Sequence, residues 1–122
     1  MYELSVEGQF SAAHRLVEYP GNCARWHGHN WQVTVFVQAT ELDGLGMAVD
    51  FRQLKAILAS VLQKYDHRDL NEVDSLSGAN PTCERIAQSL YRDLAAELYR
   101  ENVRLVRVRV SETPSTAVTY SE

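Results

Sequence analysis

The sequence has few cysteines, no long apolar run and no secretion signal, and each absence removes a class of protein. The spacing of Cys23 and Cys83 carries no pairing signal, so no disulfide framework is expected. No apolar stretch approaches the roughly 20 residues that a membrane span needs. The first residues also lack the basic and then apolar pattern of a signal peptide. We therefore expect a cytoplasmic protein without membrane contacts, in which both thiols are reduced.

An excess of basic residues is also missing. The formal net charge is -4 at pH 7, and the 12 lysines and arginines are scattered along the chain. A nucleic-acid partner is therefore not expected, because such surfaces gather basic side chains on one face. The chain shows no internal repeat, low-complexity tract or linker. With 122 residues, 45% of them hydrophobic, it is long enough for one core and too short for two, which predicts a single domain over residues 1–122.

Two segments near the start alternate apolar and polar residues, as half-buried strands do. The first begins at residues 2–6 and meets Gly8, which we interpret as a bulge or a point of close backbone approach. If the register survives Gly8, the apolar face continues to His14. The second strand covers residues 31–39, where the alternation is cleaner. Residues 15–25 contain a Pro-Gly-Asn run and are predicted to form a long loop between these strands.

Two helices are predicted next. Asp50, with Gln53 three residues later, has the pattern of a capping box, and apolar residues at helical spacing continue to Tyr65. Asn80 as the cap and Pro81 at the first helical position predict the start of the second helix.

Two further strands, at residues 103–111 and about 117–120, complete the order β-β-α-α-β-β. This order predicts an α+β fold in which a four-stranded antiparallel sheet carries both helices on one face. Such a sheet leaves two edges unpaired and its second face uncovered. One way to cover these edges is to join the sheets of several subunits into a closed barrel. We therefore expect a homo-oligomer.

Three of the four histidines belong to the two N-terminal strands. Counting back by twos along the second strand places His29 and His27 on its apolar face, and His14 ends the first strand. An i, i+2 pair on extended backbone can converge on one ion with a third ligand from a neighbouring strand. A lone histidine on an apolar face is more often a hydrogen-bonded core residue, but three together favour a metal. Three histidines leave one coordination position open, which is typical of catalytic Zn²⁺.

Two other groups have both an ordinary and a chemical interpretation. Cys23, in the loop just before His27, is either a buried thiol or an acid or base activated by nearby positive charge. Asp66 and His67 form either a solvated turn or a working pair. Since adjacent residues do not face each other in a strand or helix, pairing would need a turn geometry or a partner from elsewhere. We interpret Cys83, in the first helical turn, as packing.

Glu112 has the same parity as three valines of the third strand, at positions 106, 108 and 110. It is either a strand-end carboxylate that points to water or a carboxylate on the buried face. In the second case it needs a partner, such as the amidine-like edge of a ligand.

Taken together, six segments resemble the successive signatures of the pyruvoyl-tetrahydropterin synthase and carboxytetrahydropterin synthase family. The resemblance runs nearly end to end and in the same order, although no single motif is specific. The segments are residues 10–14, 23–30, 47–51, 66–71, 80–84 and 111–113.

This resemblance implies the tunnelling fold, in which three subunits close a barrel and two trimers stack into a homohexamer with active sites between subunits. It implies a zinc-dependent lyase that acts on a pterin triphosphate, dihydroneopterin triphosphate. The implied roles cover the candidates above: His14, His27 and His29 bind Zn²⁺, Cys23 is a general base, Asp66 and His67 from a neighbouring subunit relay protons, Glu112 anchors the pterin, and Thr82 joins it in the substrate site.

Two branches of this family form different products. The Asn80-Pro81-Thr82 run and the short length resemble the carboxytetrahydropterin branch, which releases acetaldehyde and triphosphate on the path to queuosine. The pyruvoyl branch of biopterin synthesis is the alternative. Cys83 departs from the family pattern, in which a small Ser, Ala or Val is usual. Outside the family, the alternatives are a three-histidine zinc hydrolase or lyase with another substrate and a zinc-dependent binding module.

Overall fold

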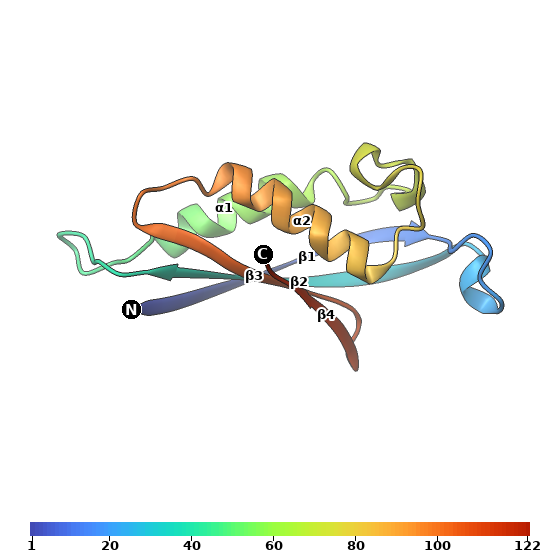
Figure 1. Cartoon of the computed structure of the whole chain (residues 1–122), viewed down its shortest axis with the longest axis horizontal. Helices are drawn as coiled ribbons and strands as arrows, with labels where there is room; N and C mark the ends of the chain where they lie inside the picture. Colours follow the sequence, from blue (N-terminus) through green and yellow to red (C-terminus); the bar gives the residue numbers. More distant parts are fainter.

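The computed structural model describes residues 1–122 apart from the side chain of Cys23. In the described part of the chain, four strands form one antiparallel sheet in the order β1-β2-β3-β4. Helices α1 and α2 lie together on one face of this sheet (Figure 1). The predicted fold class is therefore confirmed. The elements are β1 (Tyr2–His14), β2 (His27–Ala39), α1 (Phe51–Leu62), α2 (Cys83–Glu97), β3 (Val103–Thr113) and β4 (Thr116–Tyr120), with short 3-10 turns η1 (Asn22–Ala24), η2 (Leu70–Glu72) and η3 (Asp74–Leu76).

The first strand passes Gly8 without losing register. Its pairing with β2 runs unbroken from Tyr2 to His14, so the predicted bulge is wrong and the close approach is right. A Cβ atom at Gly8 would lie 3.0 Å from Leu58 Cδ2 and 3.0 Å from Leu62 Cδ1. Glycine therefore lets α1 pack closely against the strand, and the unbroken alternation carries the apolar face on to His14.

Helix α1 begins as predicted, since the Asp50 carboxylate accepts a hydrogen bond of 2.8 Å from the backbone N–H of Arg52. Gln53 does not complete a capping box. Its side-chain oxygen instead accepts a hydrogen bond of 3.1 Å from Arg100.

Helix α2 begins two residues later than predicted. Thr82 is its N-cap and accepts from the backbone N–H of Arg85 at 3.3 Å. The amide of Asn80 is occupied elsewhere: it accepts from the backbone N–H of Val17 at 2.7 Å and donates to the carbonyl of the same residue at 2.9 Å. The prediction of Asn80 as the cap and Pro81 as the first helical residue is therefore wrong, because a long-range contact captured the capping side chain.

A register shift corrects the predicted face of β3. Leu105 pairs with Val37 and Arg107 pairs with Phe36, so Val106 is an extra residue in the strand. Leu105 is buried while Val106 is only half-buried, so Val106 does not share the buried face of the later valines.

The core lies between the helices and the apolar face of the sheet, and its largest fully buried side chains include Trp31, Phe10, Leu54 and Leu90. Part of the outer edge of β1 is covered by residues 66–69, because His67 N donates to Ser11 O at 2.6 Å and Ala13 N to Arg68 O at 3.2 Å. Across the described residues, no helix is long and apolar enough to cross a membrane.

Candidate metal centre

The three histidines predicted as ligands meet at one end of the sheet. His14 pairs directly with His27 across β1 and β2, and His29 follows two residues later on the same face. One ligand nitrogen from each ring lies within 4.8 Å of the others. The spacing of two along β2 and the cross-strand pairing together produce a cluster that could hold a metal ion.

Backbone carbonyls fix the orientation of two of these rings. His14 Nδ1 lies 2.8 Å from Pro81 O, and His27 Nδ1 lies 2.8 Å from Arg25 O. A carbonyl oxygen only accepts, so each Nδ1 carries the proton and each Nε2 keeps a free lone pair in the neutral ring. Among the described buried side chains, His14 Nε2 has no hydrogen-bond partner. A metal ion bound there would satisfy this buried atom.

Burial also favours the neutral form of two of these rings. Loss of solvent is the main cause that lowers the pKa of His14 and of His29, and the negative charge of Glu112 opposes this shift only in part. Neutral imidazole is the form that binds metal ions, so these rings resist the protonation that competes with metal binding.

Glu112 lies beside the histidines in spite of a second register shift in β3, between Val110 and Thr113. Its Oε2 atom is 3.7 Å from His14 Nε2 and 3.6 Å from His29 Nε2. The side chain is 32% exposed, so it faces a cavity rather than the closed core. Of the two interpretations of Glu112, the structure supports the carboxylate on the site side of the sheet.

We call this cavity the histidine pocket. It has a volume of about 480 Å³, and Glu112, Thr82 and Cys83 line it together with the three histidines. Thr82 therefore both caps α2 and reaches the pocket. The Cys83 thiol donates to Val110 O at 3.4 Å, and burial is the main cause that raises its pKa to about 11. This supports the packing interpretation of Cys83, although its place in the lining of the pocket was not predicted.

Asp66 and His67 do form a pair, with His67 Nδ1 3.0 Å from Asp66 Oδ1. The turn supplies the geometry, because His67 has a left-handed backbone with φ of 56°. Asp66 Oδ1 also accepts from Ser11 N at 2.9 Å, which is the main cause that holds the pKa of this carboxyl below its usual range.

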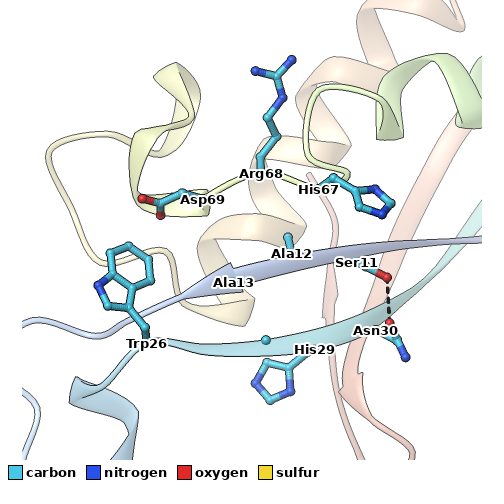
Figure 2. A pocket seen from close by; sticks show the side chains of 10 residues that line it. Ser11, Ala12, Ala13, Trp26, His29, Asn30, His67, Arg68 and Asp69 are labelled. Carbon is cyan, nitrogen blue, oxygen red and sulfur yellow. Dashed lines mark hydrogen bonds between the residues drawn. The ribbon is translucent and has the colours of Figure 1, made fainter.

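This pair is not among the described residues that line the histidine pocket of its own chain. His67 instead lines a second cavity of about 620 Å³ at the β1 edge, to which His29 also contributes. Figure 2 shows His67 above β1, whereas the ring of His29 points away from it, below β2. Within one subunit, the structure therefore does not direct the pair at the histidine cluster.

The side chain of Cys23 lies outside the described residues, so its role as a base stays a prediction. Its neighbour Asn22 lines the histidine pocket.

Trp31 also packs against the site, although it was not among the predicted site residues. Its ring is fully buried and lies edge-on to His14 and His29, with centroid distances of 5.0 Å and 5.2 Å. Its Nε1 donates to Ala12 O at 3.2 Å. The alternation of β2 could have indicated this, since Trp31 continues the i, i+2 series of His27 and His29 and therefore lies on the same face of the strand.

Comparisons with known proteins show which family and which fold the chain resembles. A family model described as 6-pyruvoyl tetrahydropterin synthase matches residues 3–122. The 6-carboxy-5,6,7,8-tetrahydropterin synthase of Bacillus subtilis is 34% identical over 126 residues, which cover 98% of this chain and 84% of that protein. The protein of the same name from Synechocystis is 36% identical over 126 residues, covering 98% and 93%. The structure of Caenorhabditis elegans 6-pyruvoyl tetrahydropterin synthase superposes with a TM-score of 0.85 at 28% identity, covering 99% of this chain and 95% of that one.

Proposed function

This chain belongs to the 6-pyruvoyl tetrahydropterin synthase family, and from this premise we propose that it is a zinc-dependent lyase of the carboxytetrahydropterin branch. It would convert 7,8-dihydroneopterin triphosphate to 6-carboxy-5,6,7,8-tetrahydropterin and release acetaldehyde and triphosphate, as a step toward queuosine. The observation that carries the proposal is the convergence of three histidines beside a carboxylate in one pocket. The names of the two bacterial relatives support this branch.

His14, His27 and His29 would hold the zinc ion through their Nε2 atoms, which the carbonyl contacts of His14 and His27 favour for those two rings. The donor set fits the ion, because neutral imidazoles are common zinc ligands and three of them leave a position for substrate. When bound, zinc supplies Lewis-acid chemistry that acidifies the hydroxyl and C–H groups of the pterin side chain.

The protein groups would move the protons. Cys23, as a thiolate, would take a proton from the side chain of the pterin. His67 would donate a proton to the pterin or remove one from it. The Asp66 carboxylate, kept ionised by the N–H of Ser11, orients the imidazole of His67. In this scheme Cys23 and His67 act in one active site although they come from different subunits.

The expected assembly is a homohexamer of two stacked trimers, in which the sheets of three subunits close a barrel. Two observations support it. The Asp66 and His67 pair does not line the described histidine pocket of its own chain, and the sheet ends at β4 on one side and at β1 on the other.

Mixing inactive subunits should test the sharing of sites. Cys23→Ala and His67→Ala proteins, each inactive alone, should regain activity after they are dissociated together and reassembled, because some sites then combine both wild-type groups. The regained fraction should follow random assembly, measured by turnover and native mass spectrometry. Mixed hexamers that are confirmed by mass and remain inactive would show that the pair acts within one chain or not at all.

Glu112 would anchor the pterin, because two adjacent N–H donors on its pyrimidine edge match two carboxylate oxygens. Glu112→Gln keeps the shape of the side chain but replaces one acceptor oxygen by an NH2 donor. That donor would face an N–H donor of the pterin. We expect pterin binding to weaken by roughly 2 kcal/mol or more, with zinc content unchanged. Calorimetry with a non-reactive pterin measures this, and Glu97→Gln, an exposed change at the end of α2, is the matched control. Equal affinities for wild type and Glu112→Gln would mean that the ring is held elsewhere.

The experiment that tests the proposed function is incubation of the zinc-loaded protein with dihydroneopterin triphosphate, followed by mass spectrometry of the products. A 6-carboxy pterin with acetaldehyde supports the proposal. A 6-pyruvoyl product would assign the chain to the other branch, which the name of the C. elegans structure represents. Hydrolysis that leaves the pterin side chain intact, or binding without turnover, would contradict both branches.

A further inference from the structure

Tyr65 is a fully buried residue directly before the Asp66 and His67 pair, and its hydroxyl is held by helix α2. The hydroxyl donates to Asp93 Oδ2 at 2.7 Å and lies 2.7 Å from Ser89 Oγ. Burial is the main cause that raises the pKa of Tyr65 to about 12, so the phenol keeps the proton that it donates. The turn that follows α1 is therefore attached to α2 through a network of polar side chains, which also includes Ser75.

The two residues after Tyr65 are attached on the opposite side, to β1. Asp66 Oδ1 accepts from Ser11 N at 2.9 Å, and His67 N donates to Ser11 O at 2.6 Å. Three consecutive residues are thus fixed between α2 and β1.

The ring of Tyr65 packs into the same aromatic layer that supports the histidine cluster. It lies 5.7 Å from the ring of Phe10, which stacks on Trp31 at 5.8 Å with an interplanar angle of 5°. Trp31 in turn packs edge-on against His14 and His29. The histidine cluster and the segment that carries the Asp66 and His67 pair therefore both pack against one set of aromatic rings.

The backbone conformation of His67 is not one that the residue would adopt without support from its surroundings. Its side chain is 82% exposed, and its backbone φ of 56° is unfavourable for a residue with a side chain. Such a conformation persists only where the surrounding structure imposes it. The contacts around it are those of β1, where Ser11 O accepts from His67 N and Ala13 N donates to Arg68 O, and those of α2 with the Tyr65 hydroxyl.

We propose that Tyr65 is a positioning residue whose hydroxyl, tied to Ser89 and Asp93, fixes the backbone that aims His67 into the active site. This inference rests on the proposed function, in which Asp66 and His67 relay protons. It adds a requirement to that function: the aim of the relay depends on a buried hydrogen bond within its own subunit.

The test is Tyr65→Phe, which removes the hydroxyl and keeps the ring against Phe10. We expect kcat to fall about tenfold or more, with zinc content and KM unchanged, because small misplacements of a reacting group cost rate rather than binding. Amide hydrogen exchange at His67 should quicken by about tenfold.

Tyr91→Phe is the matched control. It removes another buried hydroxyl of α2, which donates to Leu105 O at 3.4 Å, away from the pair. Its kcat should stay within about twofold of wild type, as for a change that touches no group of the site. If Tyr65→Phe does not assemble, Ser89→Ala removes one partner of the hydroxyl and should reproduce the faster exchange at His67.

Two outcomes would overturn the inference: wild-type kcat and exchange in Tyr65→Phe, or an equal loss of kcat in Tyr91→Phe. Failure of the proposed function has a different signature, which is full activity of His67→Ala alone. In that case the exchange rate at His67 still decides whether Tyr65 fixes this segment.

Discussion

Replacing His29 by alanine should remove most of the bound zinc and essentially all activity. The remaining two imidazoles would hold the ion weakly and leave its geometry undefined. The same result is expected for alanine at His14 or His27, because the three ligand nitrogens lie together within 4.8 Å. Metal analysis of the purified variants, alongside turnover, measures both effects.

The fourth histidine gives the control for this experiment. His67 is 82% exposed and lies outside the cluster, so His67→Ala should keep its full zinc content while it loses activity. Full zinc content in His29→Ala would contradict the metal assignment.

The retention of zinc should also depend on pH. Since burial lowers the pKa of His14 and His29, both rings stay neutral to lower pH than free histidine, and zinc should be retained correspondingly further into the acid range.

Replacing Cys23 by alanine should leave zinc and pterin binding normal and lower the rate by about 10²- to 10⁴-fold, the range for a positioned proton-transfer group. Rapid-quench turnover and calorimetry on the same preparation separate the two effects. Near-normal turnover by Cys23→Ala would give the role of base to another group, of which His67 is the first candidate.

The second thiol provides an internal comparison in the wild-type protein. Alkylation at neutral pH should modify Cys23 and abolish activity, because a general base must be present as thiolate. Cys83 should be spared, since burial raises its pKa to about 11. Peptide mass spectrometry identifies the modified residue, and inactivation that tracks Cys83 instead would contradict the assignment.

The periodicity of the sequence was sufficient to locate the three candidate ligands. In a strand, side chains alternate between faces whatever the rest of the molecule does, so the spacing of His27 and His29 predicted a shared face. The same alternation carried through Gly8 to His14, and the pairing of β1 with β2 confirmed it. Asp50 was likewise identifiable as a cap, because its partner is the N–H two residues away.

The local pattern failed at two positions whose partners are far along the chain. Asn80 has the chemistry of a cap, but Val17, distant in sequence, binds its amide and moves the start of α2 to Cys83. Val106 follows the alternation of β3, yet pairing with β2 makes it an extra residue. Neither contact leaves a periodic trace in the sequence.

The sequence by itself therefore determined the strands, the helices and the shared face of the three histidines, since these depend on spacing along a regular backbone. Only the tertiary structure decided which atoms of the site are free to react. It placed Pro81 O against His14 Nδ1, brought Glu112 to the cluster across a register shift, and held the Asp66 and His67 pair against β1. Each of these contacts joins segments that are far apart in the sequence and become neighbours only in the folded chain. Such contacts depend on distance in three dimensions, and spacing in the sequence does not reveal them.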